Sequence, residues 1–472
     1  MIEGLVYFSP QLVAVIAVLI LMFGEHEEDE QYRCFRFSRV MMLLSLALAV
    51  IFYNKPPITD LSDGSSFALV FEMLLYAGGL ALLYLSRKWF AAMHRLAYVY
   101  CGCLFITLLF GYLLISSYNL VLTAVSMVMI FISNYILLKD SDNQKESSLG
   151  TRLYLLLTCI CGLMLGGVAV MLYYDCGTFD YTALKMYFEL HKESAEAFAA
   201  AAMLVVPFLF LLGLVPLHFC ITESLGKANL PVFAYMLLMP VAAAWGGFIH
   251  LNVGVLMPIM PMFRLFYIAV ALMSVGVGAV GACSGQNIRK IFAYASVYHL
   301  GIAFLTLRRL TPNALNASFV YLFVYLLAMF GISACLFGLK KKGEYLFMLG
   351  EFEGAAQKRP YISAMMVVFM FSLLGLPPFV GFLGLFSSLN YLALHHHYYQ
   401  LLYLLTSMLI VGYAYLQIIK ALCFEERKTA FDRADRGIYT AILLNAVLMF
   451  ALILQPHYLM DSFRPLLETV FQ

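Results

Sequence analysis

Few side chains in this sequence could bind and release a proton from within an apolar stretch. Glu72, His218 and His299 each stand inside or directly beside a long hydrophobic run, and Glu223 and Lys227 follow one another at a spacing of four. Histidine titrates near neutral pH, and burial shifts the pKa of a carboxyl or amine. An ionisable residue within a membrane-spanning segment is costly, so it is a functional candidate. These residues indicate proton transfer as the chemistry to test.

Each candidate also has a purely structural interpretation. Glu72 fits either a helix-packing carboxylic acid or a coupling carboxylate at a subunit interface. His218 fits either a structural histidine with satisfied hydrogen bonds or a member of a proton relay. Glu223 and Lys227 fit a surface ion pair, which contributes little stability. His299 is the best candidate for a central proton site.

The composition requires a membrane around these residues. The chain has 472 residues, of which 63% are hydrophobic and 12% are charged. In an ordinary soluble domain, roughly a quarter of the residues are charged. A helix that crosses the hydrocarbon core needs roughly 20 apolar residues, and continuous runs of that length recur along the chain. A β-barrel would instead show alternating segments of about ten residues. The sequence therefore predicts an all-α polytopic membrane protein.

About fourteen transmembrane helices are predicted within a single transmembrane domain. The connecting loops are short, and the longest lie near 175–195 and 339–360. The predicted spans are 4–24, 38–54, 66–85, 96–116, 118–138, 152–174, 196–220, 229–251, 257–282, 291–308, 314–338, 361–386, 397–420 and 436–455.

The distribution of basic residues tests this topology. When successive loops are assigned to alternate sides of the membrane, one side holds 22 of the 29 Lys and Arg residues, the other side, with both termini, holds 6, and Arg264 near a span is counted on neither side. Cytoplasmic loops carry an excess of Lys and Arg. Both termini are therefore expected to face away from the cytoplasm or matrix.

Metal and redox motifs are missing from the sequence. The cysteine pairs Cys101/Cys103 and Cys159/Cys161 are separated by one residue, which fits neither a CxxC redox site nor a zinc site. No nicotinamide fingerprint, flavin motif or iron–sulfur cysteine set is present. The sequence therefore predicts no cofactor, no metal and no catalytic residue in this chain.

An internal repeat marks two predicted helix breaks. The run LGLVPLHF begins at residue 212 and the run LGLPPFVGF at residue 374, an offset of 162 residues. Pro216, Pro377 and Pro378 each remove a backbone donor and interrupt a helix. Two broken helices at corresponding positions are typical of transporters with ion sites at the breaks. A pair of ordinary proline kinks is the alternative.

Three segments resemble one membrane-protein family. Residues 212–232, 289–301 (RKIFAYASVYHLG) and 374–386 resemble helix 7, the start of helix 10 and the broken helix 12 of the antiporter-like subunits of respiratory complex I, the NADH:quinone oxidoreductase. The chain length and the segment from Ser296 to Gly301 resemble subunit N, or subunit 2 in mitochondria, most closely.

The resemblance implies two repeated five-helix bundles with discontinuous helices 7 and 12. Three N-terminal helices in 1–95 would precede helices 4–8 in 96–252 and helices 9–13 in 257–422. A C-terminal helix in 436–455 would complete the domain.

The resemblance also implies a row of proton-relay residues, and here the chain departs from the family. The family's relay glutamate in helix 5 and its lysines in helices 7, 8 and 12 fall on Ser126, Leu211, Val241 and Leu385. One basic position survives, as Arg152 at the start of helix 6. Leucine and valine cannot titrate, so we expect that this chain does not pump protons by the family's usual route.

The resemblance further implies the partners and the location. The partners would be other membrane-arm subunits and lipids, without nucleic acid, and NADH, FMN, iron–sulfur clusters and quinone would belong to other subunits. The membrane would be the bacterial or mitochondrial inner membrane. Two alternatives remain: a subunit of a multisubunit cation/proton antiporter, and a purely structural scaffold of a related respiratory or hydrogenase complex.

Overall fold

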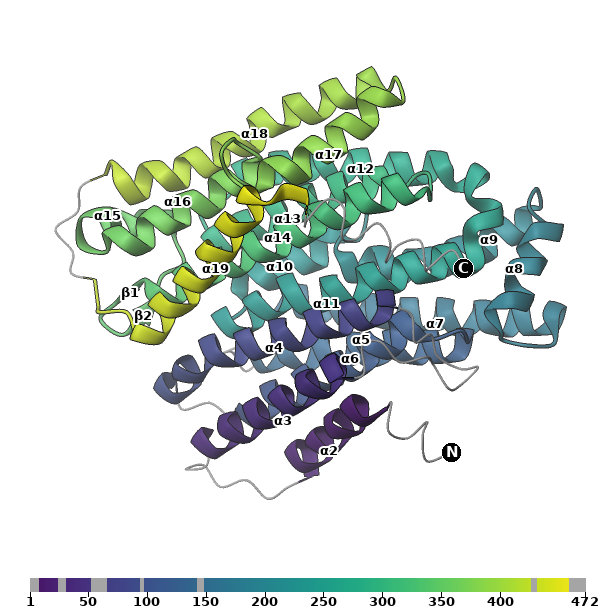
Figure 1. The fold of residues 1–472 in the computed structure, drawn as a ribbon, viewed down its shortest axis with the longest axis horizontal. Coiled ribbons are helices and arrows are strands. Elements are labelled where there is room, and N and C mark those ends of the chain that lie inside the picture. The colour runs from purple at the N-terminus through teal and green to yellow at the C-terminus, as the bar shows by residue number, and fades with distance from the viewer. Residues whose placement is uncertain are drawn as a thin grey trace. The chain divides into compact units, whose positions relative to one another are not determined.

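The structure is a computed structural model that describes residues 8–23, 31–51, 66–93, 97–141, 148–425 and 431–457. Helices form nearly all of this part of the chain (Figure 1). The strands among the described residues are β1 (Lys340–Lys341) and β2 (Glu344–Tyr345), which pair antiparallel. The predicted all-α fold class is therefore confirmed.

The length and composition of the helices suit a lipid bilayer, and the chain is an integral membrane protein. In the described part of the chain, ten helices are long and apolar enough to cross a membrane, and three shorter apolar helices lie at Ser9–Met22, Pro360–Leu374 and Gly381–Leu394. A helix satisfies its own backbone hydrogen bonds, which lipid cannot do. The count of fourteen spans stays a prediction.

By its internal contacts the chain divides into two compact units. Unit 1 contains residues 1–212, 238–263 and 466–472, and unit 2 contains residues 213–237 and 264–465. Among the described residues, the unit boundaries lie at the end of α9 (Ala195–Leu212), within α11 (Leu230–Leu251) and within α12 (Met260–Cys283). These units reflect contacts within the fold, whereas the predicted bundles reflect a repeat in the sequence. The predicted division into repeated bundles therefore stays a prediction.

In unit 1, α5 is largely buried and packs against α2, α4 and α6. The elements of unit 1, besides its parts of α11 and α12, are α2 (Ser9–Phe23), α3 (Gln31–Ile51), α4 (Ser66–Met93), α5 (Ala97–Ser116), α6 (Leu120–Ser141), α7 (Leu149–Cys176), α8 (Tyr181–Leu190), α9 (Ala195–Leu212), a π-helical turn (Asn252–Leu256) and a 3-10 turn (Met257–Ile259).

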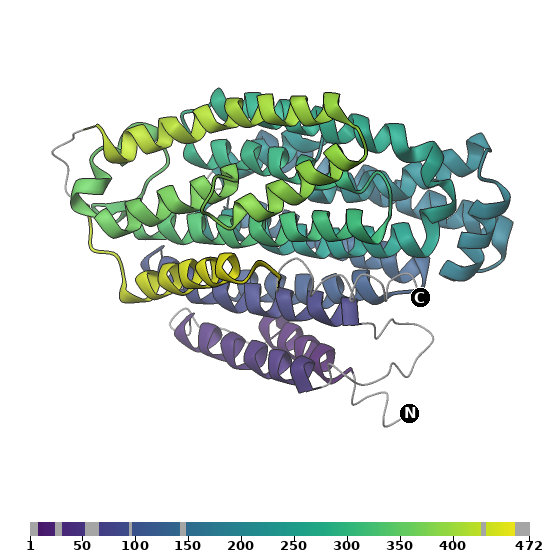
Figure 2. The same ribbon diagram turned by 45° about the horizontal axis from the view of Figure 1, so that its top comes forward.

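In unit 2, α14 occupies the centre and packs against α13, α16, α17 and α19. The chain then returns in α18, which runs alongside α16 and α17 (Figure 2). The elements of unit 2, besides its parts of α11 and α12, are α10 (His218–Lys227), α13 (Ile288–Thr306), α14 (Pro312–Gly338), β1, β2, a 3-10 turn (Leu349–Phe352), α15 (Ala355–Lys358), α16 (Pro360–Leu374), α17 (Gly381–Leu394), α18 (Tyr398–Cys423) and α19 (Arg436–Leu454).

The two longest predicted loops contain more secondary structure than expected. The segment 175–195 includes α8, which buries Leu184 and Phe188, spaced four residues apart on one helix face. The segment 339–360 includes the β1–β2 pair and two short helices. Such short elements escape a search for spanning runs because they gain their stability from packing rather than from length.

Candidate functional site

Two interruptions of the helices share one backbone conformation. One separates α9 from α10, and the other separates α16 from α17. Gly213 and Gly375 begin these interruptions with φ of 69° and 72°, a left-handed conformation that favours glycine. A cis peptide bond precedes Pro216 in the first segment and Pro378 in the second. The equivalent glycines lie at the two positions that the repeated motif aligns.

A serine hydroxyl satisfies a backbone amide freed at each interruption. The Val215 N–H donates to Ser274 Oγ at 3.0 Å, and the Gly381 N–H donates to Ser372 Oγ at 3.1 Å. Non-helical backbone at membrane depth is tolerated only where protein or a wet cavity satisfies it. A Cβ on Gly381 would lie 1.5 Å from the carbonyl oxygen of Ser372, so only glycine fits there.

His299 lies in the interior of unit 2, between two tyrosine hydroxyls. Its side chain is 1% exposed. Its Nδ1 lies 2.9 Å from the Tyr321 hydroxyl, and its Nε2 lies 2.9 Å from the Tyr415 hydroxyl. A neutral imidazole donates from one nitrogen and accepts at the other, and a hydroxyl can serve either nitrogen. Both ring nitrogens are therefore satisfied without any charged partner.

A second hydroxyl pair lies beside His299. Ser296 Oγ and the Tyr325 hydroxyl are 2.6 Å apart, and Tyr325 donates to the Leu237 carbonyl at 3.2 Å. The rings of His299 and Tyr325 have centroids 6.3 Å apart. We define the His299 cluster as Ser296, His299, Tyr321, Tyr325 and Tyr415. It is a buried group of polar side chains that can exchange protons through hydroxyls and one imidazole.

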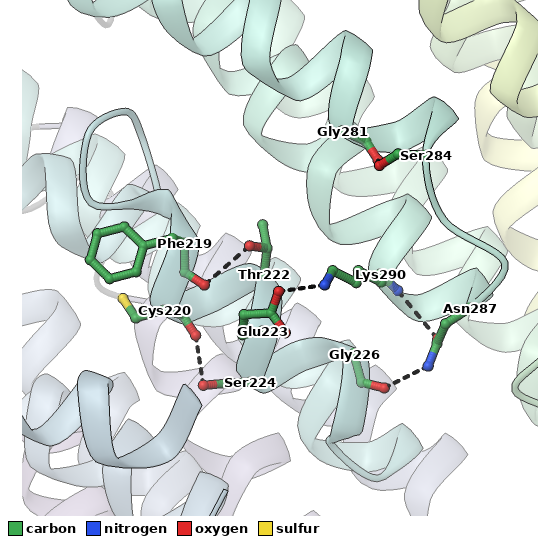
Figure 3. A network of polar contacts seen from close by, with 10 residues as sticks. All are labelled: Phe219, Cys220, Thr222, Glu223, Ser224, Gly226, Gly281, Ser284, Asn287 and Lys290. Atoms are coloured by element: carbon green, nitrogen blue, oxygen red, sulfur yellow. Dashed lines mark hydrogen bonds and ion pairs between the residues drawn. The ribbon is translucent and has the colours of Figure 1, made fainter. Parts of the chain in front are cut away.

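A further polar network joins α10 to α13 (Figure 3). The carboxylate of Glu223 pairs with Lys290 Nζ, and Asn287 Nδ2 donates to the Gly226 carbonyl at 2.8 Å. The expected pairing of Glu223 with Lys227 is therefore wrong. The reason is tertiary, because α13 packs against α10 and brings the stem of Lys290 to Gly226. The charged side chains are 34% and 42% exposed, so this is a partly solvated tie between the two helices.

Glu72 is buried in unit 1, where its side chain meets an amide. Gln11 Nε2 donates to Glu72 Oε1 at 2.6 Å, and Glu72 is 1% exposed. Among the described residues, Glu72 Oε2 and Gln11 Oε1 have no hydrogen-bond partner. A protonated carboxyl could return a hydrogen bond from Oε2 to the amide oxygen, and it would need no cation. This geometry joins α2 to α4.

The remaining predicted relay residues stand apart from these clusters. His218 begins α10, and its ring centroid lies 6.2 Å from that of Tyr294. Arg152 is exposed on α7. Lys227 ends α10 and is exposed. Within each unit, no hydrogen bond or ion pair of the described residues joins one predicted relay residue to another.

The four positions to which the resemblance assigns relay residues are all buried. Ser126 on α6, Leu211 on α9 and Val241 on α11 are 0%, 3% and 4% exposed. Leu385 on α17 is 7% exposed, and its side chain lies 2.6 Å from the point where a Cβ on Gly375 would stand. Leu385 therefore packs directly on the second helix interruption, in an apolar contact that a lysine amine could not make.

Sequence analysis missed several residues that complete the polar sites. Tyr321 and Tyr325 share one face of α14 at a spacing of four, and Lys290 lies within the recognised segment 289–301, so a signal existed for these three. Ser274 and Tyr415 carry no comparable sequence signal, since each meets its partner only after the chain has returned from a distant helix.

Metal-ligand geometry gives no further site. Among the described residues, no group of three or more His, Cys, Asp or Glu side chains is arranged to hold a metal ion.

Comparison with known proteins gives a family and similar relatives. The family described as NADH:quinone oxidoreductase/Mrp antiporter, TM matches residues 117–410. The NADH-quinone oxidoreductase subunit N of Gluconacetobacter diazotrophicus is 26% identical over 434 residues, which cover 90% of each chain.

Solved structures share the fold. A chain of respiratory complex I from Thermus thermophilus with bound aureothin has a TM-score of 0.79 at 22% identity and covers 95% of this chain and 98% of its own length. A chain of the Mrp complex from a Dietzia species has a TM-score of 0.81 at 15% identity and covers 100% of both chains. The fold is thus common to assemblies that are named for different activities.

Proposed function

We propose a function for this chain from its family, since it belongs to the NADH:quinone oxidoreductase/Mrp antiporter family of membrane subunits. In this proposal it is a membrane-arm subunit of a proton-translocating NADH:quinone oxidoreductase, of the subunit N type. The observation that carries this proposal is the alignment with a relative named subunit N over 90% of both chains. An alignment over only part of each chain could reflect a single shared module. This alignment covers 90% of both chains and includes both helix interruptions.

In this role the chain would contribute no redox centre. NADH oxidation and quinone reduction, with FMN and iron–sulfur clusters, would take place in other subunits of the complex. The chain would lie in the bacterial or mitochondrial inner membrane with both termini on the periplasmic or intermembrane side, as the 22 to 6 asymmetry of Lys and Arg favours.

Proton movement through this subunit would not use the family's lysine relay. A relay lysine works because burial lowers the pKa of its amine until it exchanges protons with a neighbour. Leu211, Val241 and Leu385 hold no proton at those positions, and Leu385 instead fills the space beside Gly375. Ser126 supplies a hydroxyl at the position where the family's relay has the carboxylate of its helix 5 glutamate.

The His299 cluster is the most complete proton-exchanging group that remains. An imidazole that receives a proton from the hydroxyl on one nitrogen can release another from its second nitrogen to the opposite hydroxyl. Tyr321 and Tyr415 hold the ring in the orientation that this exchange requires. His218, Glu72, Arg152, Glu223 and Lys227 stay candidates of lower rank, because none of them shares such a chain of hydroxyls. The cluster alone does not span a membrane, and the subunit's own pumping is therefore expected to be absent.

The test is a count of protons translocated per NADH by the complex reconstituted in sealed vesicles. The variant His299→Leu/Tyr321→Phe/Tyr415→Phe removes the imidazole and the two hydroxyls that contact it, and the remaining hydroxyls of Ser296 and Tyr325 stay paired with each other. We expect its proton ratio to equal that of the wild type. The matched control replaces the helix 12 lysine of a sister antiporter-like subunit by leucine and should lower the ratio. A fall of the ratio in the His299 cluster variant would overturn the proposal of a silent channel.

Two other functions have a direct discriminator. A cation/proton antiporter subunit shares this fold, as the match to the Mrp complex shows, but the residues at Ser126 and Leu211 do not fit the expected acid and lysine. A structural scaffold would keep the assembly and move no ions. Affinity purification of the chain from its own membrane distinguishes the first case, because redox subunits with NADH oxidation activity should accompany it. Companion subunits of an antiporter without redox activity would refute the respiratory assignment.

A further inference from the structure

Four basic side chains gather at one end of unit 2 without an acidic partner. Arg264 lies in the first turns of α12, Arg308 and Arg309 follow the end of α13, and His397 directly precedes α18. We call these residues the Arg308 cluster. In the described part of the chain, none of the three arginines forms an ion pair with a carboxylate.

The four groups are close enough to influence one another's charge. Burial lowers the pKa of Arg308, and the positive charges of Arg264 and Arg309 lower it further, against an opposite effect of Tyr391. Burial together with the same three arginines lowers the pKa of His397 to about 4. Three arginine charges are therefore held together here with no carboxylate among the described residues to neutralise them, and the imidazole of His397 beside them is uncharged near neutral pH.

Arg308 is the member that most needs a counter-ion. Its side chain is 1% exposed, and Nη1 donates to Gln400 Oε1. Its Nε and Nη2 atoms are buried and have no hydrogen-bond partner among the described residues. The guanidinium carbon lies 5.8 Å from the ring centroid of Tyr391, which offers a π-face but no negative charge. A buried cation with open donors is strongly unfavourable unless an anion completes the site.

The surroundings of the cluster indicate which anion fits. Leu265 next to Arg264 is 78% exposed, so an apolar surface adjoins the basic groups. Tyr398 and Tyr399 next to His397 are 60% and 93% exposed, and exposed tyrosines are typical of the membrane–water interface. The planar fork of arginine matches the oxygens of a phosphate. A phospholipid offers both an oxyanion at this level and acyl chains for the apolar surface.

We propose that the Arg308 cluster binds the phosphodiester headgroup of an anionic phospholipid. The guanidinium of Arg308 would turn outward from its buried position, so that Nε and Nη2 donate hydrogen bonds to the lipid phosphate, and Arg264 and Arg309 would supply further positive charge. The site accounts for Arg308 and Arg309, which follow α13 on the side that the topology predicts to be poor in basic residues. The inference depends on the membrane embedding of the chain and not on its membership of a respiratory complex.

The experiment measures lipid binding by the intact purified assembly after removal of its lipids with a neutral detergent. Phosphatidylglycerol is titrated, the Tm is recorded, and native mass spectrometry counts the lipids that stay bound. Phosphatidylcholine and inorganic phosphate are titrated in parallel. We expect phosphatidylglycerol to raise the Tm of the wild type at concentrations where the other two compounds do not.

Variants locate the effect at the cluster. Arg309→Gln, at an exposed position, should weaken phosphatidylglycerol binding about fivefold. Arg308→Gln should weaken it about tenfold or more, because hydrogen bonds to a charged group are lost. Arg308→Lys keeps the positive charge but loses the planar fork of the guanidinium. Its affinity for phosphatidylglycerol should therefore lie between that of the wild type and that of Arg308→Gln. The matched control Arg433→Gln removes an exposed arginine elsewhere in unit 2 and should leave the binding unchanged.

Several results would overturn the proposal. Equal stabilisation by phosphatidylcholine would show that the anionic headgroup is irrelevant, and equal stabilisation by inorganic phosphate would show a site for a free anion. Binding that is unchanged in Arg309→Gln and Arg308→Lys would place the lipid elsewhere. Loss of a neighbouring subunit from these variants, with lipid binding unchanged, would identify a partner carboxylate as the counter-ion. Arg309→Gln and the wild-type titrations keep the test valid if Arg308→Gln fails to fold.

Discussion

Replacing His299 by leucine removes a side chain on which two buried hydroxyls depend. Tyr321 and Tyr415 are 6% and 0% exposed, and each has its hydroxyl 2.9 Å from one ring nitrogen of His299. An unsatisfied buried hydroxyl destabilises a protein by about 1–3 kcal/mol. His299→Leu should therefore lower the free energy of unfolding by about 2–6 kcal/mol.

The same reasoning predicts a rescue. When both partners of a hydrogen bond are replaced by apolar groups, the net change is nearly neutral. Adding Tyr321→Phe and Tyr415→Phe to His299→Leu should therefore recover most of the lost stability. The coupling energy from the full set of single, double and triple variants isolates the two hydrogen bonds from the change in volume.

The assay follows denaturation of the purified assembly by labelling of buried thiols. Cys335 on α14 is 0% exposed and becomes reactive only when unit 2 opens. The matched control is His396→Leu, which removes an exposed histidine that also lies 2.9 Å from a tyrosine hydroxyl. The control should change stability by about 0.5 kcal/mol or less. A loss below about 1 kcal/mol for His299→Leu, or a triple variant less stable than the single one, would refute the reasoning.

Three further perturbations have definite expected outcomes. Gly381→Ala places a Cβ 1.5 Å from the Ser372 carbonyl oxygen, so the α16–α17 interruption must shift and the amount of assembled complex in the membrane should fall sharply; normal assembly would contradict this. Lys290→Gln leaves Glu223 without its partner, but the two side chains are 34% and 42% exposed, so the fall in Tm should correspond to a loss of about 1 kcal/mol or less in the free energy of unfolding. A Glu223→Lys/Lys290→Glu exchange should restore the Tm. Leu385→Lys buries an amine at the second interruption and should destabilise the assembly by about 2.5–3.5 kcal/mol; a variant as stable as the wild type would reveal a hydrated cavity beside this residue.

Much of the fold was predictable because its cause is local. An apolar run of spanning length can satisfy its backbone hydrogen bonds only within itself, so composition alone required a helical membrane protein. The breaks were predictable for the same reason, since proline removes a donor wherever it stands, and Gly213 and Gly375 stand just before the prolines, where each interruption begins. The expectation that the relay is missing came from the types of residue at Leu211, Val241 and Leu385, which cannot titrate in any environment, and it stays a prediction.

The partners of the functional side chains depend on tertiary packing. Glu223 has a lysine four residues away in sequence, yet it pairs with Lys290, which only the packing of α13 on α10 brings within reach. His299 stands in a recognisable segment, but the hydroxyl of Tyr415 reaches it from a helix more than one hundred residues later. Side-chain type and backbone propensity are properties of single residues and short segments. Contact between distant segments is a property of the folded chain, and it alone determined which polar groups are paired and that Arg308 has no carboxylate partner among the described residues.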